Sequence, residues 1–257
     1  ASSHALAQPP RLAIGCGRQG ALATRLLRQR GSTAVQILDP RIDPRHWDLV
    51  IAPEHDGLVG DNVITLVGSL NPVDTLWLAQ ARAAFASFAD LPRPRTAVLL
   101  GGPSAHARFD LAAFEALASQ LDAALAHEGG SVMVTTSRRT PTDVIAALRK
   151  RYVETPNVVW CGDADGINPY PGMLAWADRI VASPDSVNML SEACATGVPV
   201  FVFDPDRVSG RPRRFLDALL ARRRIRRMDT TLASFPVEPL RETARVAALV
   251  KQRLSLA

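Results

Sequence analysis

Residues 183–200, SPDSVNMLSEACATGVPV, carry the pattern on which the prediction of the fold depends. The letters SPDS are typical of a helix start, because small hydroxyl and carboxylate side chains cap free backbone N–H groups. Gly197 and Pro199 end the same helix, and the apolar runs DRIVAS and VPVFVF stand before and after it. The order strand, helix, strand is that of a βαβ unit, so we predict a parallel sheet covered by helices.

The same alternation continues along the rest of the chain. Strand-like runs precede residue 91 at RLAIG, STAVQILD, DLVIA and VITLV, and follow residue 95 at TAVLLGG, SVMVTTS and NVVW. LPRPR at 91–95 interrupts the series, because its two prolines cannot continue a helix and favour extended backbone. We therefore predict an α/β fold with two Rossmann-like, doubly wound parallel-sheet domains, residues 1–93 and 94–257. The last helix, at about 238–254, is expected to pack back on the first domain.

The composition is that of a globular protein, with 47% hydrophobic and 21% charged residues. The net charge is +5, but all except two of the 30 basic residues are arginines, and no basic stretch alternates with aromatic residues. Nucleic acid is therefore not an expected partner. Three cysteines without paired spacing give neither a disulfide framework nor a zinc knuckle, which favours the reducing cytoplasm. No apolar stretch is long enough to span a bilayer.

GCGRQG at 15–20 has the spacing G-x-G-x-x-G, follows a strand-like run, and precedes Asp39 at the end of the next run. These features match the dinucleotide-binding fingerprint, so a nucleotide-sugar epimerase or dehydrogenase is the first hypothesis. Short-chain enzymes of that type use a tyrosine base with a lysine four residues later. Tyr152 and Tyr170 are followed at that distance by a proline and a leucine, which excludes the short-chain pair. Other nicotinamide enzymes remain open, as does a structural role for these glycines in a tight turn.

Ligands of doubly wound sheets bind beyond the carboxyl ends of the strands, so the loops there are the candidate lining of the site. In the helix that starts after Ser183, backbone N–H groups and the helix dipole would hold a phosphate. Glu192, two turns further, would accept hydrogen bonds from a ribose diol; the alternative is a capped helix with a solvated glutamate. The residues predicted to bind a donor and its phosphates are Gly15, Gly17, Arg18, Gly101, Gly102, Ser104, Thr136, Ser137, Arg138, Asn168, Tyr170, Ser183, Asp185, Ser186, Glu192, Arg213 and Arg214.

The helix with an acidic residue two turns in, followed by Gly-x-Pro and a strand, resembles the donor-binding segment of glycosyltransferase-B enzymes. Together with IGCGR, VQILDPR, PEHDG, GGPS, TTSRRTP and NPY, it resembles the mitochondrial-fission family named for the plant "elongated mitochondria" protein, from about Arg11 to about Arg222. The resemblance implies a glycosyltransferase-B-like fold, and the bacterial members of this family are described as glycosyltransferases or nucleotide-sugar epimerases. Members usually begin with a further strand and a loop containing Gly, Lys and His, so we expect a shortened first domain.

The resemblance implies a glycosyltransferase that binds a nucleotide-diphosphate sugar in the cleft between its domains and acts on a cell-envelope acceptor. We expect an inverting reaction with no metal and no cofactor, because helix dipoles and arginines neutralise the leaving diphosphate. His55, between Glu54 and Asp56, is the predicted base, and the same triplet is a weaker candidate for a metal site. Two alternatives stay open: a non-catalytic adaptor that recruits a fission-type partner, and a dinucleotide-binding enzyme acting on nucleotide sugars.

Residues 211–227, RPRRFLDALLARRRIRR, contain eight arginines and predict a basic, partly amphipathic helix. Such helices bind anionic membrane surfaces, so we expect peripheral contact with the inner membrane from the cytoplasm. Arg213 and Arg214 follow a strand and are placed at the donor site, whereas Arg222–Arg227 are expected to form a solvated face, with membrane or phosphate contact as the alternative. The sequence is compatible with a homo-oligomer.

Overall fold

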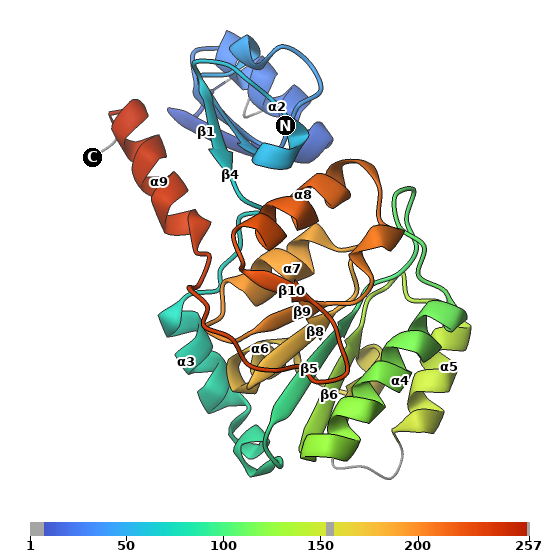
Figure 1. Cartoon of the computed structure of the whole chain (residues 1–257). Coiled ribbons are helices and arrows are strands. Elements are labelled where there is room, and N and C mark those ends of the chain that lie inside the picture. The colour runs from blue at the N-terminus through green and yellow to red at the C-terminus, as the bar shows by residue number, and fades with distance from the viewer. Residues whose placement is uncertain (1–7, 153–156, 256–257) are drawn as a thin grey trace. The chain divides into compact units, whose positions relative to one another are not determined.

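The computed structural model describes residues 8–152 and 157–255, and its elements are labelled in Figure 1. The chain forms two compact units, one of Ala1–Leu70 with Glu242–Ala257 and the other of Asn71–Arg241. We expected the division at residue 93, in the LPRPR segment. Helix α3 (Thr75–Ala84) nevertheless belongs to the second unit, because it packs against α6 (Tyr170–Trp176).

The first unit is a four-stranded parallel sheet in the order β1-β2-β3-β4. Helix α2 covers one face, where Ala21 shares a buried cluster with Trp47 and Val50. Helix α9 covers the other face through Val246, which is buried with Ile51. The elements are β1 (Leu12–Cys16), α2 (Gly17–Gln29), β2 (Thr33–Ile37), β3 (Leu49–Pro53), β4 (Val63–Leu66) and α9 (Glu242–Arg253), with 3-10 helices at Pro44–His46 and Glu54–Asp56.

The glycines of GCGRQG form a close turn between β1 and α2. Gly17 has a φ of +68°, a left-handed conformation that favours glycine. A Cβ on Gly15 would lie 2.6 Å from Thr24 Cγ2, so the helix packs directly on the strand at this position. Thr24 is buried, and its hydroxyl accepts a hydrogen bond of 2.8 Å from Trp47 Nε1. Backbone conformation therefore accounts for Gly17, and close packing accounts for Gly15.

The second unit is a six-stranded parallel sheet in the order β10-β9-β8-β5-β6-β7 (Figure 1). Its chain starts in the middle at β5, moves outward through β6 and β7, and continues from β8 on the other side of β5. Ligands of open parallel sheets bind in the crevice that such a reversal of strand order leaves at the carboxyl ends. Besides α3 and α6, the elements are β5 (Arg95–Leu100), α4 (Leu111–Glu128), β6 (Ser131–Thr136), α5 (Thr142–Arg151), β7 (Asn157–Trp160), β8 (Arg179–Ala182), α7 (Val187–Cys194), β9 (Val200–Val202), α8 (Gly210–Ala221) and β10 (Ile225–Arg227), with 3-10 helices at Ala86–Asp90, Asp163–Asp165 and Pro205–Arg207.

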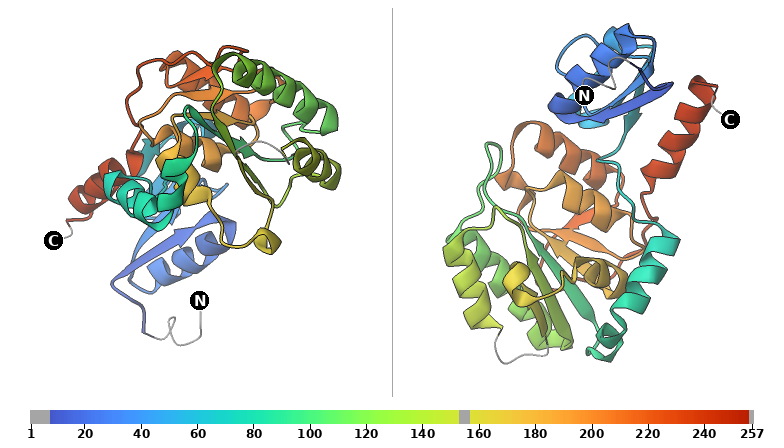
Figure 2. Two further views of the ribbon diagram at one scale, coloured as in Figure 1. Left: turned by 90° about the horizontal axis from the view of Figure 1, so that it is seen from below. Right: turned by 180° about the vertical axis from the view of Figure 1, so that it is seen from behind.

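Helices cover both faces of this second sheet, as Figure 2 shows. On one face Phe114 of α4 and Leu148 of α5 share a buried cluster with Val98 and Val134 of the sheet. On the other face α6 contacts β5 and α7 contacts β8. All residues of β5 and β6 are buried, which places these strands at the centre of the unit. The predicted α/β fold with two parallel-sheet domains is confirmed.

The Arg-rich segment at 211–227 is not one amphipathic helix, contrary to our expectation. Helix α8 ends at Ala221, and strand β10 follows after a short turn. Arg223 takes a left-handed conformation with a φ of +54°, and backbone hydrogen bonds from Arg223 and Arg224 to the last turn of α8 close the helix. The arginine side chains therefore do not share one helix face.

Arg224 is buried, with 5% of its surface exposed, so the solvated position that we expected is wrong for this residue. Its guanidinium donates to Cys194 O at 2.9 Å, to Thr196 O at 2.8 Å, and to Ala193 O and Val198 O at 3.3 Å. These carbonyls lie at the C-terminal end of α7 and just beyond it, where the helix dipole is negative. Arg224 thus caps the helix that carries Glu192.

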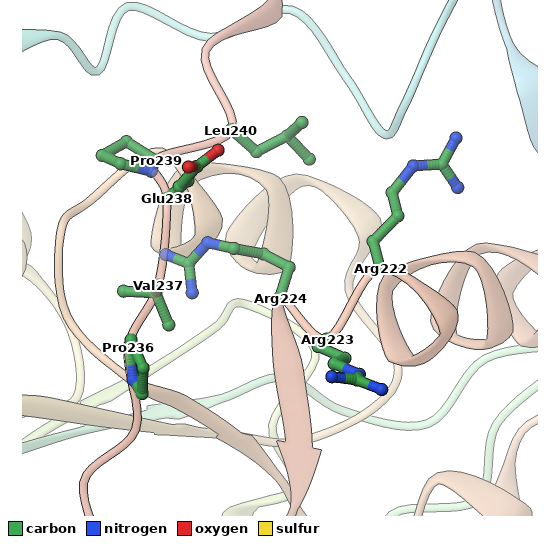
Figure 3. Close-up of a pocket in the computed structure, with 8 residues that line it drawn as sticks. All are labelled: Arg222, Arg223, Arg224, Pro236, Val237, Glu238, Pro239 and Leu240. Carbon is green, nitrogen blue, oxygen red and sulfur yellow. The ribbon is translucent and has the colours of Figure 1, made fainter.

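Replacing Arg224 with Met removes one donor from each of these carbonyls, although Cys194 O keeps Leu240 N and Ala193 O keeps Thr196 N. We therefore expect the free energy of unfolding to fall by roughly 2–4 kcal/mol. Arg223→Met is the matched control. Figure 3 shows Arg222 and Arg223 pointing away from the 236–240 segment, which Arg224 faces across a pocket of about 460 Å³. Urea denaturation followed by circular dichroism measures both variants, and equal losses in the two would contradict the role of Arg224.

Candidate functional site

The candidate site lies in the second unit, at the carboxyl ends of β5 and β8, where the strand order reverses. Asp185 is its central residue, because its side chain has no exposed surface and three groups donate to it. Gly102 N donates to Oδ2 at 2.9 Å, Ser183 Oγ to Oδ1 at 2.6 Å, and Arg139 Nη2 to Oδ2 at 2.8 Å. Gly101 N donates in turn to Ser183 Oγ at 2.7 Å. One buried carboxylate thus joins the loops after β5, β6 and β8.

The loop after β6 is fixed by further bonds of this network. Arg139 Nη1 donates to Gly102 O at 2.9 Å and to Pro103 O at 3.2 Å. Thr140 is buried, and its hydroxyl accepts from Ser137 N at 3.0 Å. The Arg139 side chain remains 43% exposed, so part of its guanidinium faces solvent. Arg139 is therefore a cation held in a fixed position beside the start of α7.

Glycine is required at both positions after β5, because the loops approach each other closely. A Cβ on Gly101 would lie 2.1 Å from Asp185 Oδ2, and one on Gly102 would lie 2.2 Å from the Arg139 carbonyl oxygen. Neither gap admits a methyl group. The GGPS pattern therefore reflects the packing of three loops around one carboxylate.

Tyr170, at the start of α6, and Glu192, in α7, are brought together by the fold. The Tyr170 hydroxyl donates a hydrogen bond to Glu192 Oε2. Burial raises the pKa of Glu192, and the hydrogen bond from Tyr170 opposes this shift. Burial, followed by the Glu192 charge, raises the pKa of Tyr170 well above its ordinary value. Within the described chain no cation pairs with Glu192, so its carboxylate is an acceptor held by one hydroxyl.

The start of α7 follows directly after Asp185. Ser186 is the N-cap, and its Oγ accepts from Met189 N at 3.4 Å. Glu192 lies six positions after Ser186, which is about 9 Å along the helix axis at about 1.5 Å per residue. The helix therefore presents its N-terminal N–H groups at one place and a carboxylate two turns further on.

Other predicted residues of the second unit have different roles. Arg138 is exposed, and its neighbour Arg139, which our prediction of the donor site omitted, is the arginine that contacts Asp185. Asn168 Oδ1 accepts from Tyr170 N at 3.0 Å in the turn that leads into α6. Ser104 is exposed and forms a β-bridge with Ala107. Thr136 is buried at the end of β6, beside Cys161.

Arg213 and Arg214, which we placed at the donor site, lie in α8. Arg213 donates to Asp217 Oδ1 at 2.8 Å and to Asp206 Oδ1 at 2.6 Å, and these two hydrogen bonds raise its pKa. Hydrogen bonds from Arg227 and from Arg213 lower the pKa of Asp206 to about 2. The partners of Arg213 are thus surface carboxylates and not the loops around Asp185. In residues 8–152 and 157–255, no helix has the length and apolar character needed to cross a membrane.

The candidate residues of the first unit follow β1 and β3. Arg18 is exposed, and Glu54–Asp56 form a 3-10 helix that ends at Gly57, with a φ of +72°. Asp39, the acidic residue of the dinucleotide pattern, pairs with Arg41 at 2.9 Å. Among the residues that the structure describes, no group of three His, Cys, Asp or Glu side chains is arranged to hold a metal ion, and the triplet containing His55 is not such a group.

Comparison with known sequences identifies relatives along the whole chain. Residues 1–254 match the model of a family described as "Mitochondrial fission ELM1". The mitochondrial fission protein ELM1 of Arabidopsis thaliana is 31% identical over 277 residues, which cover 96% of this chain and 64% of the relative. The chain thus spans less than two thirds of that relative's length. The protein RP120 of Rickettsia prowazekii (strain Madrid E) is 24% identical over 288 residues, covering 96% of this chain and 81% of RP120.

Comparison with solved structures shows a glycosyltransferase-B-like fold. The UDP-GlcNAc 2-epimerase from Methanocaldococcus jannaschii aligns with a TM-score of 0.55 and 13% identity, over 97% of this chain and 79% of the enzyme. Os79 T291V from O. sativa in complex with UDP aligns with a TM-score of 0.52 and 12% identity, over 98% of this chain and 79% of Os79. At this level of identity the similarity concerns the fold alone.

The raised pKa of Glu192 predicts how stability depends on pH. In the unfolded chain this carboxyl ionises near its ordinary value of 4.5, and in the folded chain it ionises at a higher pH. Ionisation therefore destabilises the folded protein as pH rises from 4.5 toward the folded pKa, and this cost is absent below 4.5. Glu192→Gln has no such cost and keeps an acceptor for Tyr170.

We expect Glu192→Gln to unfold at a higher temperature than the parent at neutral pH, and at the same temperature below about pH 4.5. Calorimetry across this range measures the difference. Glu238→Gln serves as the control, because it makes the same exchange at an exposed position. A parent that is more stable than Glu192→Gln at neutral pH would show that the carboxylate is not destabilised by burial.

Proposed function

Since the chain belongs to the mitochondrial fission ELM1 family and has a glycosyltransferase-B-like fold, we propose that it binds a nucleotide-diphosphate sugar and transfers the sugar to an acceptor. The observation that carries this proposal is the Tyr170–Glu192 pair, two helix turns beyond the loops joined by Asp185. The solved structures of Os79 T291V from O. sativa and of MnaA from S. aureus are complexes with UDP, so uridine diphosphate is the first nucleotide to test.

The diphosphate is proposed to lie at the start of α7. Free N–H groups and the positive end of the helix dipole favour an anion there. Arg139 stands next to the same helix start through its 2.8 Å bond to Asp185, and its exposed part supplies a cation. Because Asp185 is fully enclosed by its donors, it supports these groups without itself presenting a charge to the phosphates.

The ribose is proposed to bind Glu192. A ribose diol offers two O–H donors, and the Glu192 carboxylate has lone pairs beyond the one that Tyr170 uses. The distance of about 9 Å along α7 from Ser186 to Glu192 separates the phosphate position from the sugar position, as an extended nucleotide requires. Donation from the diol would also offset the burial of this carboxylate.

Transfer needs a base for the acceptor hydroxyl, and His55, flanked by Glu54 and Asp56, is the proposed base. The acceptor oxygen attacks the anomeric carbon from the side opposite the diphosphate, and the bond to the diphosphate breaks, so the configuration at that carbon is inverted. The proton of the acceptor hydroxyl passes to His55. The helix dipole and Arg139 stabilise the departing diphosphate without a metal. We place the acceptor at the cell envelope, because the exposed Arg223 and Arg226 suit an anionic membrane surface.

A second candidate function is a non-catalytic adaptor that binds the same ligand and recruits a protein. The name of the Arabidopsis thaliana relative, a mitochondrial fission protein, supports it. The two functions share the ligand site and differ in turnover. A dinucleotide-binding enzyme is a third candidate, and stabilisation by NAD distinguishes it from the other two.

Ligand binding is tested by thermal unfolding with uridine, guanosine, cytidine and adenosine diphosphates, their sugars, and NAD. A ligand that binds only the folded state raises the unfolding temperature as its concentration exceeds the Kd. We expect one nucleotide family to stabilise the parent and Glu192→Ala to lose this response, while Glu238→Ala keeps it. Stabilisation by NAD alone would favour the dinucleotide enzyme, and an unchanged response in Glu192→Ala would remove Glu192 from the site.

Turnover is tested by the release of nucleoside diphosphate from the stabilising sugar nucleotide in the presence of membrane extracts as acceptor. We expect His55→Ala to lower the rate about 100-fold or more, because removal of a general base has effects of this size. Its thermal response to the nucleotide should remain that of the parent. Ligand binding without release of diphosphate by the parent would favour the adaptor.

A further inference from the structure

We propose that helix α2 of the first unit is a docking surface for an anionic lipid bilayer, in which two leucines insert between the headgroups while arginines contact the lipid phosphates. The surface, named the α2 face, consists of Arg18, Leu22, Arg25, Leu26 and Gln29, and α2 is labelled in Figure 1. It lies in a different unit from α7, the helix proposed to bind the nucleotide. The inference therefore does not depend on the transferase function.

Two leucines stand on the side of α2 that points away from the sheet. The buried residues Ala21, Thr24 and Leu27 mark the side that packs on the sheet. At about 3.6 residues per turn, Leu22 and Leu26 lie on the opposite side, one turn apart. Leu22 is 65% exposed and Leu26 is 38% exposed. A surface helix normally carries polar residues at such positions, so the α2 face is apolar where water favours polar side chains.

The α2 face is also basic, and it has no acidic residue. The helix sequence GRQGALATRLLRQ contains three arginines, and no Asp or Glu precedes Asp39 in the sequence. Arg28 pairs with Asp48 at 3.1 Å. Arg18 and Arg25 have no carboxylate partner among the residues that the structure describes. Their charges are therefore available to an anionic partner.

The small size of the apolar surface favours a bilayer over a protein groove. Stable protein–protein interfaces bury about 1,200–2,000 Å² in total, and a helix that binds a protein groove carries apolar anchors over several turns. The α2 face has two leucines within one turn, and polar or charged residues precede and follow them. A bilayer needs no matching groove, because leucine side chains enter the boundary of the acyl chains and guanidiniums pair with headgroup phosphates.

The exposed arginines of the second unit differ from the α2 face in one respect. Among the described residues, no large hydrophobic side chain between 211 and 227 is exposed, and Arg226 stacks over the Phe235 ring at 4.2 Å. Arg223 and Arg226 therefore offer charge without an apolar group that could insert. Membrane binding through α2 requires both its arginines and its leucines.

Binding is measured by co-sedimentation with vesicles of phosphatidylcholine alone, and with vesicles that contain about 40 mol% phosphatidylglycerol, at about 0.1 M sodium chloride. We expect the parent to bind the anionic vesicles and not the neutral ones. Arg25→Gln should lower the partition coefficient about fivefold, the usual contribution of one arginine at an anionic surface. Leu22→Gln combined with Leu26→Gln leaves the net charge unchanged and should lower it about tenfold or more, because no apolar group is left to insert.

Helix α3 of the second unit offers matched controls. Leu76 is 66% exposed, and Arg82 is exposed on the same helix, so Leu76→Gln and Arg82→Gln repeat the exchanges elsewhere. We expect both to bind like the parent.

The proposal is overturned if the parent does not bind anionic vesicles, if it binds neutral vesicles equally well, or if the α3 variants lose as much binding as the α2 variants. Unchanged binding in the double leucine variant also overturns it, because the contact would then be purely electrostatic. Circular dichroism checks that each variant is folded. Should the double leucine variant not fold, Leu22→Gln alone takes its place.

Discussion

The candidate site depends on one buried carboxylate. Asp185 has no exposed side-chain surface, and its charge is tolerated because Arg139, the Gly102 amide and the Ser183 hydroxyl all donate to it. Since these donors come from different loops, none of the loops can move without leaving a buried charge short of a partner. The absence of side chains at Gly101 and Gly102 follows from the same constraint, because a Cβ at either position would meet the network itself. The geometry of the site is thus a consequence of neutralising one charge.

The two edges of the six-stranded sheet favour charges of opposite sign. In a parallel sheet with crossover helices, helix N-termini gather at the carboxyl edge of the strands and helix C-termini at the amino edge. Anions are favoured at the first edge and cations at the second. Arg95, Arg179 and Arg224, each buried, stand at or just before the start of β5, β8 and β10. Arg224 binds helix carbonyls, whereas Nη2 of Arg179 has no hydrogen-bond partner among the described residues, so the arginines at this edge are not equivalent.

Much of this arrangement was predictable from periodicity, because alternating apolar runs and capped helices fix the order of elements and the edge at which their loops meet. That order brought Gly101, Gly102, Ser183 and Asp185 into one network, as four of the predicted donor residues. Side-chain direction within a loop was not predictable. We predicted Arg138 as the site arginine, but its neighbour Arg139 is the one that binds Asp185. Likewise, the basic run at 222–227 contains one buried arginine, Arg224. Helix α3 belongs to the second unit because it contacts α6, which is distant in sequence. Local sequence patterns do not reveal such a contact.

The two acidic residues of the site show how support and ligand contact can be told apart. Asp185 is paired with a guanidinium and saturated by donors, so it has no capacity left for a ligand. Glu192 is half-buried, its partner among the described residues is the Tyr170 hydroxyl, and burial raises its pKa. A desolvated carboxylate without a cation lowers the stability of the folded chain, so stability does not account for its presence. A ligand that donates hydrogen bonds would account for it, by satisfying the remaining lone pairs. We therefore propose Glu192 as the ligand contact and Asp185 as the residue that supports the loops beside it.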